Sequence, residues 1–109
     1  MRRVLFVCSG NEDRSPTAEA LLGGKEGIDV KSAGTHAIAK TARRLTKESV
    51  KWASEIYAME EEHREAIERA DPLAKNKVVV LGIEDNYCRD SPELVKILKQ
   101  KLSRYFDEV

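Results

Sequence analysis

Residues 3–22 read RVLFVCSGNEDRSPTAEALL and predict three consecutive elements. Residues 3–7 are one arginine followed by the continuous apolar run of residues 4–7, which favours a strand buried on both faces. Residues 8–15 are polar and contain a glycine, which indicates a loop. Pro16 suits the first turn of a helix, and the residues through Leu22 favour its continuation. The N-terminal segment is therefore predicted to be a buried strand that leads through a polar loop into a helix.

The alternation of strands and helices continues along the chain. Further strands are predicted at residues 28–32, 55–59 and 77–81, and further helices at residues 46–52, at 60–70 and from Pro92 through Tyr105. This order predicts an α/β domain with a parallel sheet. Ligands in such folds bind beyond the carboxyl ends of the strands, so the loops at residues 8–15 and 82–90 should open on the same edge of the sheet.

The length and composition limit the possible architectures and partners. The 109 residues suffice for one domain, residues 1–109. The chain has 19 Lys and Arg residues and 19 Asp and Glu residues, so it carries no net charge that would attract nucleic acid or an anionic membrane. No apolar stretch approaches the ~20 residues of a membrane helix. The two cysteines, Cys8 and Cys88, cannot form a disulfide framework. We therefore expect a cytoplasmic monomer with reduced thiols.

The loop at residues 8–15 has the features of an anion-binding cradle. Backbone N–H groups point out of a helix start, and the helix dipole there favours an anion. A loop that curls over this end can surround an oxyanion with amide hydrogens, and Gly10 allows such a path. The planar fork of Arg14 matches two phosphate oxygens. The segment therefore predicts a site for phosphate or a similar oxyanion.

Cys8 lies where the predicted strand meets this loop, so its sulfur can lie at the bottom of the cradle. The same amides and Arg14 would stabilise a thiolate, which is the reactive form of the side chain. Ser15 can donate a hydrogen bond to the sulfur, and Asn11 can brace the loop from within. A lone cysteine after a strand is more often an inert apolar residue, but that interpretation leaves the neighbouring polar residues unexplained. We therefore interpret Cys8 as a nucleophile.

Several motifs resemble those of the low molecular weight protein tyrosine phosphatases. They follow one another in the family's order and are Val7-Cys8-Ser9-Gly10-Asn11 with Arg14-Ser15-Pro16-Thr17-Ala18-Glu19, Ser32-Ala33-Gly34-Thr35, Ala42-Arg43 with Leu45-Thr46, Tyr57-Ala58-Met59-Glu60, and Ile83-Glu84-Asp85-Asn86-Tyr87. The resemblance implies a phosphotyrosine protein phosphatase I-like fold, which is a three-layer α/β/α arrangement with a four-stranded parallel sheet. It also implies hydrolysis of phosphotyrosine, of other phosphorylated protein side chains or of small phosphomonoesters, without a metal or other cofactor.

The resemblance further implies a two-step reaction. Cys8 attacks phosphorus and forms a cysteinyl-phosphate, while Arg14 binds the phosphate and Asp85 protonates the leaving oxygen. Water then attacks the intermediate, with Asp85 acting as the base. Asp90 is a rival acid, although a helix-cap role accounts for it. The implied substrate-binding residues are Ser9, Gly10, Asn11, Glu12, Asp13, Ser15 and Tyr87.

Glu12 and Asp13 depart from the family's usual loop, which often has an apolar or small residue followed by a cysteine. Two interpretations are open. Both carboxylates face solvent or hold basic groups in place, or Glu12 meets a cationic group on the substrate, such as the guanidinium of phosphoarginine. Cys88 also departs from the family, which often has an aromatic residue there. A reversible disulfide between Cys8 and Cys88 under oxidation is a further hypothesis.

Two other functions are compatible with the sequence. An arsenate reductase shares this fold and loop, and it would use Cys8 and Cys88 in series. A non-catalytic phosphate-binding domain would use the same cradle, although it would not need Asp85. His36 and His63 lie in no metal-binding or catalytic pattern, and both are predicted to be ordinary surface residues.

Overall fold

A sheet of four parallel strands carries the polar loop. The computed structural model describes residues 1–109. The strands β1 (Arg2–Cys8), β2 (Ile28–Gly34), β3 (Glu55–Ala58) and β4 (Val78–Val80) pair in the order β2-β1-β3-β4. The helices are α1 (Arg14–Leu22), α2 (Lys47–Trp52), α3 (Glu61–Ala70) and α4 (Pro92–Leu102), with the 3-10 helix η1 (Pro72–Lys77) before β4. The predicted α/β fold with a parallel sheet is confirmed.

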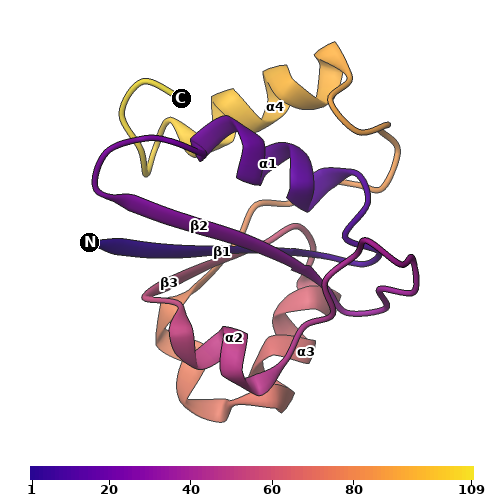
Figure 1. Ribbon diagram of the computed structural model, residues 1–109, viewed down its shortest axis with the longest axis vertical. Coiled ribbons are helices and arrows are strands. Elements are labelled where there is room, and N and C mark those ends of the chain that lie inside the picture. Colours follow the sequence, from indigo (N-terminus) through magenta and orange to yellow (C-terminus); the bar gives the residue numbers. More distant parts are fainter.

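Helices cover both faces of the sheet. Figure 1 shows α1 and α4 on one face and α2 and α3 on the other. Val4 and Phe6 of β1 belong to the apolar core on the side of α1 and α4, whereas Leu5 and Val7 belong to the core on the opposite side. All of these side chains are fully buried, which explains why residues 4–7 of the central strand are all apolar. The three-layer α/β/α arrangement is therefore confirmed.

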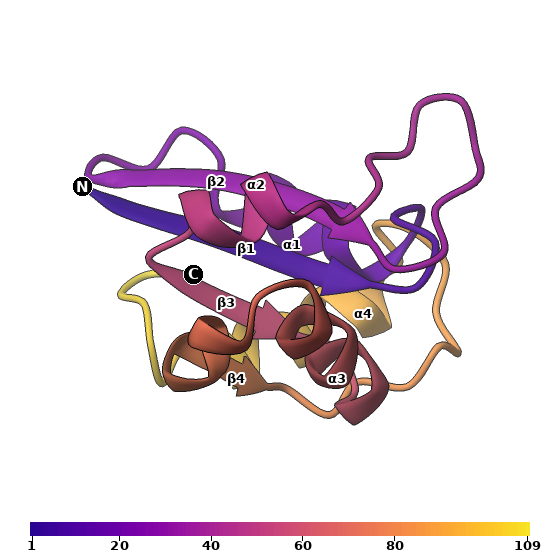
Figure 2. The same cartoon turned by 90° about the horizontal axis from the view of Figure 1, so that it is seen from below.

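The segments that follow β1, β2 and β4 gather at one edge of the sheet. Figures 1 and 2 show them together beyond the carboxyl ends of the strands. The N–H of Thr35 donates to the carbonyl of Cys8 (2.9 Å), and the N–H of His36 donates to that of Ser9 (2.8 Å). These bonds hold the segment after β2 against the loop after β1, at the edge where parallel folds bind ligands.

Side-chain caps define the starts of two helices. Thr46 caps α2 by accepting from the N–H of Ser49 (3.1 Å), and Ser91 caps α4 by accepting from the N–H of Leu94 (3.3 Å). The short η1 was not predicted, because residues 72–77 show no helical spacing of apolar residues. None of the helices is long and apolar enough to cross a membrane.

The C-terminal end differs from the prediction. The helix was expected to extend its apolar stripe to Tyr105, but α4 ends at Leu102. The chain then turns, with the N–H of Phe106 donating to the carbonyl of Leu102 (2.9 Å). This turn puts Phe106 in the core and leaves Tyr105 37% exposed. Phe106 packs against Tyr57 with 5.5 Å between ring centroids.

Candidate active site

Residues 9–13 connect β1 to α1, and none of their backbone N–H groups donates to a backbone carbonyl. In most buried or half-buried loops these groups are paired. Here they remain available, directly before the N-terminus of a nine-residue helix. Free amides at a helix start form a concave site that attracts an anion. The loop therefore has the backbone chemistry of an oxyanion cradle.

The end of β2 lies directly against this loop. A Cβ atom on Gly34 would stand 2.6 Å from the carbonyl oxygen of Ser9 and 2.8 Å from the amide nitrogen of Asn11. Both distances are shorter than real carbon contacts, so only glycine allows this approach. Asn11 has a φ of 54°, a left-handed conformation that asparagine tolerates better than most residues. The loop is thus a tight turn that is packed against the neighbouring strand.

The side chain of Asn11 fixes this conformation. Its Nδ2 donates to the hydroxyls of Ser15 (3.0 Å) and Ser32 (2.9 Å). Its Oδ1 accepts from the backbone N–H of Arg43 (2.7 Å). The buried amide thereby connects the loop to α1, to β2 and to the segment that follows β2. Asn11 braces the loop from within, and its polar atoms face the protein.

Cys8 lies at the bottom of the loop and is almost completely buried. Its Sγ is 2.9 Å from the Oγ of Ser15. The Ser15 oxygen accepts a hydrogen bond from Asn11, and its single hydrogen has two acceptors in reach, the Cys8 sulfur and the carbonyl of Ala33 at 3.5 Å. The sulfur is the nearer of the two, so the hydroxyl can donate to it. A hydroxyl that donates to sulfur stabilises the thiolate and makes it a better leaving group.

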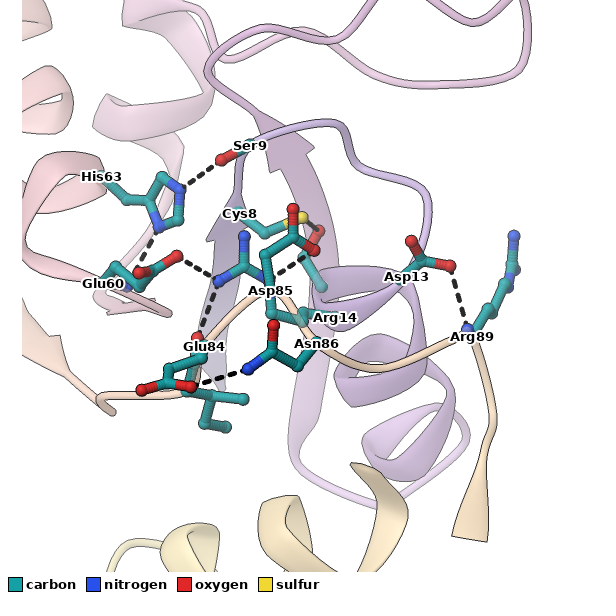
Figure 3. A network of polar contacts seen from close by, with 12 residues as sticks. Cys8, Ser9, Asp13, Arg14, Glu60, His63, Glu84, Asp85, Asn86 and Arg89 are labelled. Carbon is teal, nitrogen blue, oxygen red and sulfur yellow. Dashed lines mark hydrogen bonds and ion pairs between the residues drawn. The ribbon is translucent and has the colours of Figure 1, made fainter. Parts of the chain in front are cut away.

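A small cavity of about 70 Å³ opens above the sulfur. It is lined by Cys8, Gly10, Glu12, Asp13, Arg14 and Asp85. The Nε of Arg14 is 3.7 Å from a carboxylate oxygen of Asp85, and in the view of Figure 3 the Asp85 carboxylate stands in front of the Cys8 side chain. The predicted nucleophile, cation and acid come from β1, α1 and the segment after β4. The fold brings these three side chains to one hollow.

The two candidate acids, Asp85 and Asp90, lie in different surroundings. Asp85 lines the cavity, and its side chain is 65% exposed. Asp90 is absent from the lining, and its nearest charged partner is the neighbouring Arg89 at 3.9 Å. The N–H of Asp90 donates to the hydroxyl of Thr17 (2.9 Å). The helix-cap role expected of Asp90 is wrong, because the side chain that caps α4 is that of Ser91. Of these two residues, only Asp85 is therefore placed to transfer a proton in the cavity.

Several predicted substrate-binding residues have side chains that bond within the protein. Ser9 pairs with His63, and Asn11 and Ser15 pair with each other. Tyr87 is half-buried and packs against the core on the side of α1 and α4. None of these four side chains lines the small cavity.

Three other predicted substrate-binding residues, Gly10, Glu12 and Asp13, do line the small cavity. The carboxylate of Asp13 also accepts from the backbone N–H of Arg89 (2.9 Å).

The prediction that His63 is a surface residue is wrong, because its side chain is fully buried. Its Nδ1 accepts from the backbone N–H of Glu60 (3.0 Å), so this nitrogen carries no proton. In the neutral ring, Nε2 carries the proton and donates to the hydroxyl of Ser9 (2.8 Å). Figure 3 shows the ring between these two partners. The exposure of His36 is as predicted.

Glu60 is the other residue at the site for which the sequence predicted no role, although it ends one of the family-like motifs. Its carboxylate accepts from Nη1 of Arg14 (2.5 Å). The contact arises because Ala58 pairs with Val7 in the sheet, so the chain after β3 runs beside the catalytic loop. Glu60, Glu62 and His63 bring donor atoms within 4.8 Å of one another. Both nitrogens of His63 are already hydrogen-bonded, so this cluster offers no complete ligand set to a metal ion.

Comparison with known proteins decides the family. A sequence model of the low molecular weight phosphotyrosine protein phosphatases matches residues 3–54. The protein-arginine-phosphatase of Geobacillus stearothermophilus is 37% identical over an alignment of 101 residues, which covers 72% of this chain and 68% of that protein. The chain belongs to the low molecular weight protein tyrosine phosphatase family.

Two further comparisons agree with this assignment. The low molecular weight protein-tyrosine-phosphatase Etp of Escherichia coli K12 is 32% identical to this chain, and the alignment again covers 72% of this chain and 68% of that protein. The structure of Vibrio vulnificus Wzb in complex with benzylphosphonate superimposes with a TM-score of 0.75 at 26% identity, covering 95% of this chain and 96% of that one. The family resemblance found in the sequence is therefore confirmed.

His63 should make the phosphatase less stable as the pH falls below about 6.5, the pKa of an unperturbed histidine. Burial lowers the pKa of His63, and the Arg14 guanidinium lowers it further, against the opposing carboxylates of Glu62, Glu60 and Asp85. The unfolded chain therefore binds this proton more readily than the folded one. The stabilisation is fully present above about pH 6.5 and is lost as the pH falls toward the folded-state pKa.

The comparison variant is His63→Gln, because glutamine keeps a capping acceptor at the third helical position and does not titrate. Melting temperatures should be measured from about pH 7.5 to about pH 5.5, a range that spans the unperturbed pKa. We expect the melting temperature of the wild type to fall more steeply than that of His63→Gln. Parallel curves would contradict a role for His63 protonation.

Proposed function

We propose that this phosphatase hydrolyses phosphorylated protein side chains, with Cys8 as the nucleophile, Arg14 as the phosphate ligand and Asp85 as the general acid. The observation that carries the proposal is that these three side chains line one small cavity. The cavity lies above free backbone amides at a helix start, which is where a phosphoryl group would be bound. Membership of a phosphatase family supports the same reaction.

In the first step, the Cys8 thiolate attacks phosphorus, and the bond to the leaving oxygen breaks. Asp85 gives its proton to that oxygen, because an alkoxide or phenoxide leaves poorly without one. Arg14 and the loop amides bind the non-bridging oxygens, on which the charge is spread in the transition state. The products of this step are the dephosphorylated side chain and a cysteinyl-phosphate.

In the second step, water attacks the cysteinyl-phosphate. Asp85, now ionised, accepts a proton from the water, and the bond between sulfur and phosphorus breaks. Ser15 assists because its hydroxyl is 2.9 Å from the sulfur and can donate to the departing thiolate. Inorganic phosphate is released, and both Cys8 and Asp85 return to their starting protonation states.

Hydrolysis of p-nitrophenyl phosphate by the purified, reduced protein tests this proposal. The assay is run in the presence of a chelator, because the amides and Arg14 take the role that a metal would have. Release of p-nitrophenol supports the proposal. Absence of turnover by a folded protein would contradict it.

Phosphoarginine is a second candidate substrate, and the position of Glu12 favours it. The Glu12 carboxylate lies beside Gly10, because a Cβ atom on that glycine would be 3.2 Å from Oε2 of Glu12. Glu12 lines both the small cavity and a larger neighbouring cavity of about 780 Å³. With Asp13 and Asp85 it surrounds the mouth with carboxylates, which suits a substrate with a cationic guanidinium beside its phosphate. One relative is a protein-arginine-phosphatase.

We expect Glu12→Gln to lower the preference for phosphoarginine over phosphotyrosine by about fivefold, the effect of an exposed ion pair of ~1 kcal/mol. The measurement is kcat/KM for two peptides that differ only in the phosphorylated residue, with wild type and variant side by side. The phosphotyrosine peptide is the internal control for general damage to the site. An unchanged ratio would exclude a contact between Glu12 and the guanidinium.

We also propose that residues 1–109 work as one domain and as a cytoplasmic monomer. Both cysteines are free thiols, and Cys88 is exposed, which suits a reducing compartment. The Cα radius of gyration of 12.5 Å agrees with the ~13 Å expected for one domain of about 100 residues. Size-exclusion chromatography with light scattering tests the oligomeric state, and a dimer mass would contradict the proposal.

A further inference from the structure

Arg14 is held from one side only. Its Nη1 donates to the carboxylate of Glu60 (2.5 Å) and to the carbonyl of Ile83 (2.7 Å). This nitrogen has two hydrogens, so both are used. The two acceptors come from the start of α3 and from the segment after β4. Because the guanidinium is planar, fixing one nitrogen from two directions sets the orientation of the whole group.

The opposite edge of the guanidinium remains available. Nε and Nη2 carry parallel hydrogens, which can bind two oxygens of one phosphate. Nε lies 3.7 Å from Asp85, so this edge faces the cavity that both side chains line. Glu60 is not among the residues that line the cavity. It therefore binds Arg14 from behind and leaves the edge that would meet the substrate free.

Glu60 is itself tied to the catalytic loop through His63. The N–H of Glu60 donates to Nδ1 of His63 (3.0 Å), and Nε2 of His63 donates to the hydroxyl of Ser9 (2.8 Å). The contacts thus run from Ser9 through His63 and Glu60 to Arg14, which directly follows the loop at residues 9–13. His63 and Arg14 are both almost completely buried, whereas the side chain of Glu60 is 35% exposed. Solvent therefore screens the Arg14–Glu60 pair only in part.

We propose that Glu60 is a positioning residue, which aims the Nε–Nη2 edge of Arg14 at the phosphoryl group. This inference rests on the proposed function, in which Arg14 binds phosphate. This positioning role differs from one in which Glu60 competes with phosphate for Arg14. A carboxylate that competed with phosphate would occupy the edge facing the cavity, whereas Glu60 occupies the far nitrogen. His63 holds the backbone from which Glu60 extends.

The test uses inorganic phosphate as the probe and Glu60→Ala and Glu60→Gln as the variants. The phosphate dissociation constant is measured by phosphorus NMR, and kcat/KM is measured with p-nitrophenyl phosphate. We expect Glu60→Ala to weaken phosphate binding and to lower kcat/KM by about 10- to 100-fold, the size of one hydrogen bond to a charged group. Glu60→Gln keeps an acceptor for Nη1, so it should recover part of this loss.

Glu61→Ala is the matched control. Glu61 is the next residue, it pairs with the exposed Arg64 (3.1 Å), and it does not contact Arg14. We expect it to bind phosphate as the wild type does. Thermal melting of every variant separates a change in the site from a loss of folding. Unchanged or tighter phosphate binding by a folded Glu60→Ala would overturn the proposal, and tighter binding would indicate competition instead.

A double-mutant cycle with Arg14→Lys tests whether Glu60 acts through Arg14. Lysine has no planar fork to orient, so Glu60→Ala should change phosphate binding by less than about threefold in that background. An equal loss in both backgrounds would show that Glu60 acts by another route. A wild type that neither binds phosphate nor turns over would instead contradict the proposed function itself. If the wild type turns over and Glu60→Ala has the same phosphate binding and the same kcat/KM, only the positioning role is contradicted.

Discussion

Cys8→Ser should abolish hydrolysis of p-nitrophenyl phosphate, with a loss on the order of 10⁴-fold or more in kcat. Serine is nearly the same size, so the loop should keep its structure. Its hydroxyl, however, is far less acidic than a thiol and is a poor nucleophile without an adjacent base. The cavity lining contains no histidine that could act as that base. His63 uses both ring nitrogens elsewhere.

Cys88→Ser is the control for the Cys8 variant. Cys88 is exposed, whereas Cys8 is buried beneath the cavity. We expect Cys88→Ser to keep the activity of the wild type. Similar melting temperatures for all three proteins would show that the fold is intact. Substantial turnover by a folded Cys8→Ser would exclude Cys8 as the nucleophile.

Asp85→Asn should lower kcat/KM by about 10²- to 10⁴-fold, the usual contribution of a general acid. The loss should depend on the leaving group. Phenolate needs the proton more than p-nitrophenolate does, so the loss should be larger with phenyl phosphate than with p-nitrophenyl phosphate. The measurement is kcat/KM for both substrates, because this quantity reports the step in which the leaving group departs.

Asp90→Asn is the matched control for Asp85→Asn. Asp90 lies on the same segment and has a left-handed φ of 60°, which asparagine also tolerates. Its carboxylate is absent from the cavity lining, so we expect activity close to that of the wild type. A larger loss for Asp90→Asn than for Asp85→Asn would reverse the assignment of the acid. Equal losses with both phenyl substrates would argue against proton transfer to the leaving group.

The sequence predicted the parts of the site that are local in the chain. Cys8, Arg14 and Ser15 belong to one strand–loop–helix segment, where backbone geometry relates position to orientation. The α/β alternation predicted that the segment after β4 would open at the same edge, and the family resemblance pointed to Asp85 within that segment. These elements depend on apolar runs, proline and helix caps, and such signals act over a few residues.

The parts that the sequence did not predict depend on contacts across the sheet. Glu60 and His63 lie 46 and 54 residues from their partners Arg14 and Ser9. In sequence they belong to a strongly charged helix, and such a pattern usually indicates a solvated face. The pairing of β3 with β1 turns the start of that helix toward the catalytic loop. Burial of His63 is therefore a property of the fold, and its own neighbours in the chain carry no sign of it.

The central claim is a covalent bond between Cys8 and phosphorus during turnover. The direct measurement is acid quenching of the enzyme during steady-state hydrolysis of p-nitrophenyl phosphate, followed by mass spectrometry of its peptides. We predict one added phosphoryl group on the peptide that contains Cys8, and no phosphoryl group on the corresponding peptide of Cys8→Ala. Continued turnover with an unmodified Cys8 peptide, or with the phosphoryl group on another residue, would contradict the account.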